Sequence, residues 1–241
     1  MILFELKKLV KHFGGLAAVN GVSFKVEKGE IFGLIGPNGS GKTTIFNCIS
    51  SYYSVTGGNI YFKNQDITGL KTNKICKIGI GRTFQVVKPL GRLTVMDNVI
   101  AAAFSKAKTK KEARRVANET LEFCGLIHRK DVLAKSLPIG ERKRLEITRA
   151  MATRPELLLL DETAAGLNPS EVDAAINLIK KIRNKGVTII IVEHIMKVIM
   201  TISDRIHAIN FGQTITEGTP QEVVSNPAVI EAYLGEEYAQ S

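Results

Sequence analysis

A glycine-rich segment, Gly36–Thr44, contains residue types that bind phosphate groups. It reads Gly-Pro-Asn-Gly-Ser-Gly-Lys-Thr-Thr, in which two glycines separated by four residues precede Lys42 and Thr43. Glycines let the backbone turn tightly, so that successive N–H groups point toward one anion. Lys42 can bring a positive charge to the β- and γ-phosphates, and the Thr43 hydroxyl can bind Mg²⁺. The segment therefore predicts a binding loop for nucleotide phosphates.

Two acidic residues follow a run of leucines later in the chain. The run Leu157–Leu160 predicts a buried strand, and open parallel sheets bind their ligands at the carboxyl ends of their strands. Asp161 is therefore predicted to bind Mg²⁺, directly or through water, and Glu162 to polarise the water that attacks the γ-phosphate. An apolar run that ends in two acids is common by itself, so this interpretation depends on the phosphate-binding loop upstream.

Two further side chains could contact the γ-phosphate or its metal ion. His194 follows an apolar run and a glutamate, and it is predicted to sense the γ-phosphate. Gln85 ends the sequence Arg-Thr-Phe-Gln, and its amide oxygen could bind Mg²⁺ and the attacking water. Neither residue would indicate a site alone, since a histidine at a strand end more often only completes local hydrogen bonds.

The elements that must position these residues follow an α/β pattern. A buried strand is predicted over Glu30–Ile35, with a helix that starts near Lys42. Leu157–Leu160 and Val187–Val192 are apolar without alternation and are joined by a predicted helix over Ser170–Asn184, which is typical of a parallel sheet covered on both faces. We predict further strands at 2–6, 22–26, 59–62, 205–211 and 214–217, helices at 94–104, 110–124 and 141–153, and a short helix that begins at residue 219.

Composition limits the class of protein. The chain has 33 Lys and Arg against 23 Asp and Glu, a formal net charge of +10, which suits nucleic acid, an anionic membrane surface or simply a solvated surface. The densest basic cluster, Lys106–Lys111 with Arg114 and Arg115, lacks the interleaved aromatic residues that stack on bases. We therefore predict an exposed, membrane-proximal face and no nucleic-acid partner.

The cysteines and the apolar runs indicate where the protein works. Three widely spaced cysteines are predicted to be reduced thiols: Cys48, Cys76 and Cys124. The apolar runs are too short and too often interrupted by charges to span a bilayer. The sequence does not open on a secretory leader, so we expect the chain to stay in the cytosol.

Taken in order, the motifs resemble those of the ATP-binding subunits of ABC transporters, over essentially the whole chain. Gly36–Thr44 is similar to the Walker A loop and Leu157–Asp161 to Walker B. Leu137–Glu141 lies where the ABC signature belongs, directly before a predicted helix. The resemblance implies that Phe13 stacks on adenine, that Gln85 is the Q-loop glutamine, that Ala165–Asn168 is the D-loop and that His194 is the switch histidine.

Finer details resemble the ATPases of branched-chain amino acid importers, in particular the LivG type. The matching stretches are Phe13–Asn20, Gly81–Gln85, Ala164–Pro169 and Ala232–Glu236. Urea and amide importers and lipopolysaccharide exporters use similar ATPases, so these cargoes are alternatives. A soluble ABC ATPase without a transport role, for example in iron–sulfur cluster assembly, is the main alternative from another class.

The sequence also departs from the family pattern. Pro138 and Ile139 replace the serine and first glycine of the common signature, and Pro138 offers neither a hydroxyl nor an N–H. Gly140 and the amino end of the following helix remain as donors for a phosphate. Thr163 replaces the usual proline after the acidic pair, and Asn168 replaces the D-loop aspartate.

The resemblance implies a P-loop NTPase (RecA-like) core of α/β class with an antiparallel β subdomain and an inserted α-helical subdomain. Within a single domain, 1–241, the core would comprise residues 1–85 and 150–241, and the helical subdomain with the signature residues 86–149. ATP and Mg²⁺ are the implied ligands. The implied partners are a second ABC ATPase in a head-to-tail dimer, two membrane permease subunits and, indirectly, a substrate-binding protein, at the cytoplasmic face of the inner membrane.

The site residues follow from the motifs. Those expected to bind the nucleotide are Phe13, Gly36, Pro37, Asn38, Gly39, Ser40, Gly41, Lys42, Thr43, Thr44, Gly140 and Glu141. Those expected to bind Mg²⁺ are Thr43, Gln85 and Asp161. Those expected to act in catalysis are Glu162, His194, Lys42 and Gln85.

Overall fold

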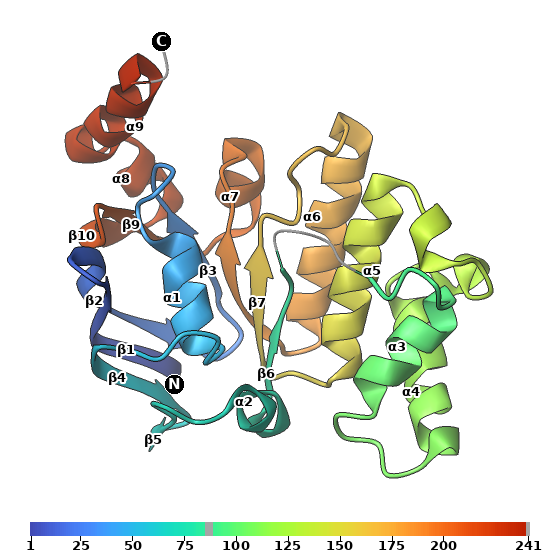
Figure 1. The fold of residues 1–241 in the computed structure, drawn as a ribbon. Coiled ribbons are helices and arrows are strands. Elements are labelled where there is room, and N and C mark those ends of the chain that lie inside the picture. The colour runs from blue at the N-terminus through green and yellow to red at the C-terminus, as the bar shows by residue number, and fades with distance from the viewer. Residues whose placement is uncertain (85–88, 240–241) are drawn as a thin grey trace.

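The structure is a computed structural model that describes residues 1–84 and 89–239, in an α/β arrangement of two sheets and flanking helices (Figure 1). The strands are β1 (Ile2–Phe13), β2 (Leu16–Glu27), β3 (Ile31–Ile35), β4 (Gly57–Phe62), β5 (Gln65–Asp66), β6 (Ile80–Arg82), β7 (Leu157–Asp161), β8 (Thr188–Val192), β9 (Arg205–Asn210) and β10 (Gln213–Gly218). The helices are α1 (Lys42–Ile49), α2 (Thr72–Ile78), α3 (Val95–Ala103), α4 (Lys110–Phe123), α5 (Ile139–Ala152), α6 (Pro169–Asn184), α7 (Met196–Ile202), α8 (Pro220–Val224) and α9 (Pro227–Ala239), with 3₁₀ turns at Ile127–Arg129 and Ala134–Ser136.

The larger sheet carries the phosphate-binding loop and the acidic pair. Its strand order is β10-β9-β3-β8-β7-β6, and all neighbours are parallel except β9 and β10. β3, β7 and β8 are buried along their whole length, which confirms the prediction of a parallel sheet with both faces covered. Because β3 and β7 are parallel and flank β8, the loop after β3 and the acids after β7 lie at the same edge of the sheet.

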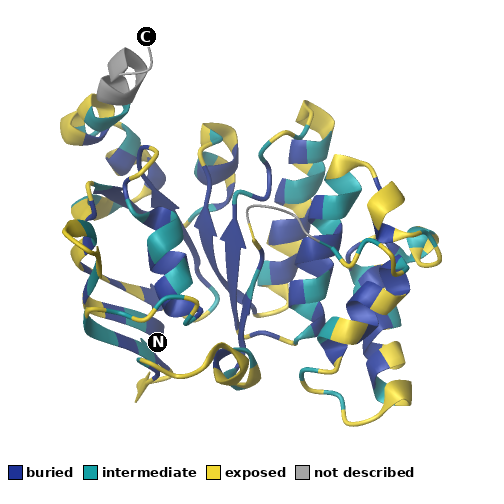
Figure 2. Cartoon of the chain, viewed as in Figure 1, coloured by how far each residue is buried: buried dark blue, intermediate teal, exposed yellow. Residues whose placement is uncertain are grey.

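The two faces of this sheet belong to two hydrophobic cores, whose residues are among the buried ones drawn in dark blue in Figure 2. On one face, Leu157 and Leu159 pack with residues of α1 and of the antiparallel sheet. On the other face, Leu158 and Leu160 pack with residues of α6 and α7. Successive leucines therefore enter opposite cores, which explains why β7 is apolar without alternation.

The smaller sheet is antiparallel, with strand order β2-β1-β4-β5. The first two strands were predicted too short, since β1 continues to Phe13 and β2 begins at Leu16. Register shifts between Leu6 and Leu9, and a positive φ of 47° at Lys8, interrupt the apolar alternation in the middle of the hairpin. The sequence pattern fades there although the strands continue.

The helices α3, α4 and α5 enclose a third core beside the larger sheet (Figure 1). The predicted start of α5 at Glu141 was wrong, because the helix begins at Ile139. Pro138 has φ −58° and ψ 161°, an extended conformation that fits the residue before a helix. Gly140 and Glu141 therefore lie inside the first turn rather than in front of it.

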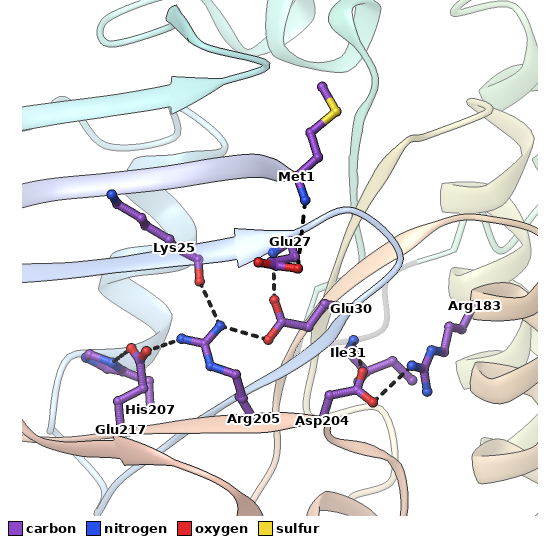
Figure 3. A network of polar contacts seen from close by, with 10 residues as sticks. All are labelled: Met1, Lys25, Glu27, Glu30, Ile31, Arg183, Asp204, Arg205, His207 and Glu217. Atoms are coloured by element: carbon purple, nitrogen blue, oxygen red, sulfur yellow. Dashed lines mark hydrogen bonds and ion pairs between the residues drawn. The ribbon is translucent and has the colours of Figure 1, made fainter.

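A partly buried polar network joins β9, β10 and the residue before β3. Arg205 donates to Glu30 Oε1 at 3.0 Å and also binds the Glu217 carboxylate, which contacts His207 Nδ1 at 2.7 Å (Figure 3). Burial raises the pKa of Glu30 against the opposing effect of Arg205. Burial also acts to raise the pKa of Glu217, but the hydrogen bond and charge of His207, together with Arg205, outweigh it and lower that pKa.

Helix caps account for the predicted starts in the last third of the chain. The side chains of Thr219 and Glu222 form a reciprocal capping box at α8, as predicted, and Asn168 forms another with Glu171 at α6. Helices α2, α7 and α9 were not predicted. α2 and α7 have only seven residues each, so two turns carry too few apolar positions to define a helical period.

The predicted exposure of the basic cluster and the predicted free thiols agree with the structure. The basic residues of the cluster around α4 are exposed. The cysteines are free thiols within the described residues, and burial raises the pKa of Cys48 and of Cys124 to about 11. No helix in the described part of the chain is long and apolar enough to cross a membrane.

Candidate functional site

The phosphate-binding loop connects β3 to α1, and two of its glycines are required by close backbone contacts. A Cβ on Gly36 would lie 2.1 Å from the carbonyl oxygen of Ile209, and one on Gly41 would lie 2.5 Å from that of Ala18. Gly41 also has φ 108°, in the left-handed region that favours glycine. The sequence was therefore right to predict a tight turn here.

Lys42 is buried at the first position of α1. Its Nζ donates to the carbonyl oxygens of Gly36 at 2.6 Å and Pro37 at 2.7 Å. The lysine thus folds back over the loop, with its charge inside the concavity where an anion would bind. The same charge acts on Asp161, where it partly opposes the rise in pKa that burial causes.

Asp161 ends β7, and Arg82 from the adjacent strand β6 binds its carboxylate. Arg82 Nη2 donates to Asp161 Oδ2 at 3.0 Å, while Nη1 donates to Asn47 Oδ1 at 2.7 Å and to Ser50 Oγ at 2.8 Å on α1. Both side chains of the ion pair are almost fully buried. Burial raises the pKa of Asp161, and the charge of Arg82 opposes that shift.

The second carboxylate oxygen of Asp161 bears on the predicted metal site. Asp161 Oδ1 is buried and has no hydrogen-bond partner among the described residues. Asp161 and the predicted ligand Thr43 line the same cavity, which has a volume of about 670 Å³. A buried carboxylate oxygen and a hydroxyl that line one cavity fit Mg²⁺, which prefers oxygen ligands and is usually bound through few protein groups together with phosphates.

Glu162, directly after β7, adopts an unusual backbone conformation. Its φ is 48°, its N–H donates to Val192 O at 2.9 Å, and its carbonyl accepts a hydrogen bond from Lys143 Nζ at 2.7 Å. Lys143 belongs to α5, so this bond joins the helix after the signature to the acidic pair. Burial lowers the pKa of Lys143, and the negative charges of Glu193 and Glu162 partly oppose this shift.

A buried carboxylate, Glu193, holds the segment after the acidic pair. Glu193 Oε1 accepts from Ala164 N at 2.7 Å and from Thr163 Oγ1 at 3.3 Å, and burial raises its pKa. The exposed His194 follows it at the end of β8. Since Asp161 lies opposite Val192 in the sheet, Glu162 and His194 leave neighbouring strand ends on the same edge.

The other predicted residues lie farther from this centre. Phe13, which is 41% exposed, ends β1 and contacts the Tyr53 ring edge-on at 5.1 Å between centroids. Gly140 and Glu141 line a different cavity, of about 130 Å³, and Glu141 Oε1 binds Arg129 Nε at 3.0 Å. The chain therefore does not bring its own signature to its phosphate-binding loop. Gln85 lies outside the described residues.

Sequence reasoning missed three charged residues of the site, Arg82, Lys143 and Glu193. Each is buried and contacts another site residue or its backbone. The only signal in the sequence is their position next to a motif, because a single charge at a strand end or on a helix is more often solvated.

Comparisons with known proteins agree with this geometry. The family described as "ABC transporter" matches residues 19–165, and the family described as "Branched-chain amino acid ATP-binding cassette transporter" matches residues 213–239. The high-affinity branched-chain amino acid transport ATP-binding protein LivG of Salmonella typhimurium is 43% identical over 250 residues, covering 97% of this chain and 98% of its own.

Solved structures give the same answer. An ATP-binding cassette of an ABC transporter in its ADP conformation is 33% identical, with a TM-score of 0.90 over 98% of this chain and 100% of its own. A bacterial ABC transporter cassette solved as a dimer is 27% identical, with a TM-score of 0.81 over 90% of this chain and 99% of its own. The chain therefore belongs to the ABC transporter family, as an ATP-binding cassette that hydrolyses ATP.

Proposed function

We propose that this chain powers the uptake of branched-chain amino acids as an ATPase subunit of an ABC importer. Two matches carry the proposal, one to a LivG protein over nearly the whole chain and one to a branched-chain amino acid transport family near its C-terminal end. The cassette itself is 43% identical to a LivG protein, and residues 213–239 match a family described by branched-chain amino acid transport. Cargo is read by other subunits, so this part of the proposal depends on the relatives.

The residues around the phosphate-binding loop would divide the work of hydrolysis. Lys42 and the loop N–H groups would bind the β- and γ-phosphates, and Thr43, Asp161 and Gln85 would hold Mg²⁺, which neutralises charge on the phosphates. Glu162 would accept a proton from the attacking water. The partnerless Oδ1 of Asp161, in the cavity that Thr43 also lines, supports this assignment.

His194 and Phe13 would complete the nucleotide site. His194 leaves the strand end next to Glu162, which suits a side chain that hydrogen-bonds the γ-phosphate. Phe13 exposes part of its ring near the end of the β1–β2 hairpin, and the opposite strand of that hairpin approaches Gly41. An exposed ring there can stack on adenine.

The signature would act on the nucleotide of a second cassette. Gly140 lies in the first turn of α5 and lines a cavity separate from the one beside Thr43. Two cassettes closed head to tail would bring the amino end of α5 in one subunit to the γ-phosphate held by the other. Hydrolysis and phosphate release would remove that bridge, and the dimer would open.

The helical part would transmit this motion to membrane subunits. We propose that residues 1–85 and 150–241 form the nucleotide-binding core and residues 86–149 a helical subdomain that moves with the signature. The segment of about Val86 to Val95, part of which lies outside the described residues, would contact the permease subunits. The chain would then act at the cytoplasmic face of the inner membrane, and a substrate-binding protein would deliver the cargo to the permease.

Purification of the tagged chain from solubilised membranes of its native host tests this proposal. We expect two integral membrane proteins and a second small ATPase to co-purify, and leucine, isoleucine and valine uptake to depend on them. Recovery of soluble proteins alone would overturn the transport role. A complex that takes up urea or amides instead would overturn the cargo.

A further inference from the structure

A side chain from the last helix of the described chain contacts the start of the phosphate-binding loop. Tyr233, on α9, accepts a hydrogen bond through its hydroxyl oxygen from the backbone N–H of Gly36 at 2.9 Å. Gly36 is the first residue of the loop, and α9 belongs to the segment 213–239 that the branched-chain family matches. We propose that this segment positions the loop for nucleotide binding, and that Tyr233 is its positioning residue.

Gly36 needs a partner at this point. It is buried, and the pairing of β3 with its neighbours extends only to Ile35. A buried N–H without a partner costs about as much as a lost hydrogen bond. The Tyr233 hydroxyl therefore satisfies the backbone where the chain leaves the sheet and turns into the loop.

The helix that carries Tyr233 is itself fixed against the core. Val229 is buried in the core behind β3, and Tyr233 packs on that same core. Asn226 holds the start of α9 by accepting from Ala228 N through its side chain at 2.9 Å. In Figure 1, α8 and α9 lie at the same end of the molecule as the loop between β3 and α1. The hydroxyl thus comes from a supported element.

The β9–β10 hairpin holds the other end of the loop. Gly212, at the hairpin turn, donates to Ser40 O at 2.9 Å, and its carbonyl accepts from Asn20 N at 2.7 Å. The backbone of Ile209 lies so close to Gly36 that it leaves no room for a side chain. The C-terminal part of the chain therefore contacts the loop near both ends, at Gly36 and at Ser40.

This arrangement bears on nucleotide affinity. The loop binds phosphates through N–H groups that must point into one concavity, and a site ordered before binding costs less to occupy. Removing the Tyr233 hydroxyl leaves the Gly36 N–H without that partner and loosens the loop before the nucleotide arrives. Tyr233 would act through Gly36 and would not touch the nucleotide.

Tyr233→Phe tests the proposal because it removes the hydroxyl and keeps the ring. We expect the Kd for ADP with Mg²⁺, measured by calorimetry on the whole chain, to rise about 2- to 10-fold, the range that one neutral hydrogen bond provides. The KM for ATP is expected to rise while kcat at saturating ATP stays within about twofold. Amide exchange of the peptide that contains Gly36–Thr44 is expected to become faster. Tyr61→Phe, on β4 of the antiparallel sheet, removes the same hydroxyl group from another element and is the matched control.

The outcomes separate positioning from general stability. Weaker ADP binding with faster exchange only around the loop, and a Tm lowered by no more than the about 2–4 °C that one lost hydrogen bond causes in a domain of this size, supports the proposal. An unchanged Kd and unchanged exchange would overturn it. Faster exchange throughout the chain together with a lower Tm would also overturn it, because Tyr233 would then stabilise the whole fold. None of these outcomes depends on the cargo or on the membrane subunits.

Discussion

Substitutions of Glu162 and of Lys42 are expected to impair different steps, the hydrolysis of ATP and the binding of nucleotide. Glu162→Gln keeps the size of the side chain but removes the base, so we expect kcat to fall about 10²- to 10⁴-fold with nucleotide affinity retained. Lys42→Ala removes the charge that lies inside the loop and is expected to weaken nucleotide binding itself. ATPase kinetics and calorimetry on both variants check this separation. Unchanged turnover in Glu162→Gln would exclude it as the base.

Arg82 is expected to matter for stability because it is the cation beside a buried carboxylate. Arg82→Met leaves Asp161 almost fully buried with its partner removed, and breaking such a pair typically costs about 3–5 kcal/mol in the free energy of unfolding. Mg²⁺ should raise the Tm of this variant more than that of the wild type, since the ion supplies the missing charge. Urea unfolding and thermal unfolding with and without Mg²⁺ measure both effects.

An exposed arginine provides the control for this experiment. Arg115 binds Glu119 on the surface of α4 at 2.6 Å, and Arg115→Met is expected to change the free energy of unfolding by less than about 1 kcal/mol. If Arg82→Met were no less stable than Arg115→Met, the pair with Asp161 would contribute nothing to the fold.

At the scale of single residues, the sequence predicts the side chains that belong to motifs and misses the side chains that support them. Lys42, Asp161 and Glu162 follow from glycine spacing and from acids at a strand end, both of which are local patterns. Arg82 and Tyr233 act through contacts with residues 79 and 197 positions away. No local pattern encodes such a partner, because the sheet order and the docking of α9 decide it.

At the scale of elements, Asn168 has a role that its motif does not indicate. It stands where the family has a D-loop aspartate, and its side chain accepts from the N–H of Glu171 to cap α6. Asn168→Ala is expected to lower the free energy of unfolding by about 1 kcal/mol. Asn168→Asp is the matched control and should keep the cap, since both side chains accept the same bond. Equal losses in the two variants would contradict the capping role.

The β9–β10 hairpin gives the protein a dependence on pH. The folded-state pKa of Glu217 lies below its ordinary value of 4.5, against burial, because of His207 and Arg205. A lowered pKa contributes stability above the unfolded-state value and loses it as the pH falls through the folded-state value. Glu217→Gln should therefore be less stable than wild type at pH 7, and the difference should narrow at pH 4 and below.

Urea unfolding across this pH range provides the measurement. The exposed Glu119→Gln is the control, and its stability should stay close to that of wild type at each pH. If the difference in the free energy of unfolding between wild type and Glu217→Gln stays constant from pH 7 to pH 3, Glu217 is excluded as the source of the acid sensitivity.

Helices and strands were predictable where a local sequence pattern, such as an unbroken apolar run or a capping residue, indicates how the element packs or begins. Leu157–Leu160 of β7 and Ile189–Val192 of β8 form unbroken apolar runs because each of these residues enters one of two cores, and the caps at Thr219 and Asn168 are local. The true start of α5 at Ile139 was missed because Pro138 and an exposed isoleucine look like a loop. The middle of β1 was missed because register shifts interrupt its alternation.

At the scale of the whole molecule, the two halves of the proposed active site face different surroundings. The cavity with Thr43 and Asp161 and the cavity with Gly140 and Glu141 share no lining residue. In the proposed mechanism a single chain therefore presents an incomplete site for the γ-phosphate, and a second cassette would supply the signature. A relative solved as a dimer of cassettes supports this proposal.

Ile139 allows the dimer to be tested apart from nucleotide binding. It is 47% exposed at the first position of α5, so Ile139→Glu should leave the monomer fold intact. In the closed dimer the new carboxylate would approach the γ-phosphate of the other subunit, and like charges in a desolvated contact repel strongly. We expect light scattering to show that the Glu162→Gln variant is a dimer in the presence of ATP. The double variant that also carries Ile139→Glu should be a monomer with the same affinity for ADP. Phe104→Glu, an exposed position in the loop after α3, should leave the dimer unchanged. A dimer that survives Ile139→Glu would exclude the signature from the interface, because no other residue of α5 is both exposed and apolar at its amino end.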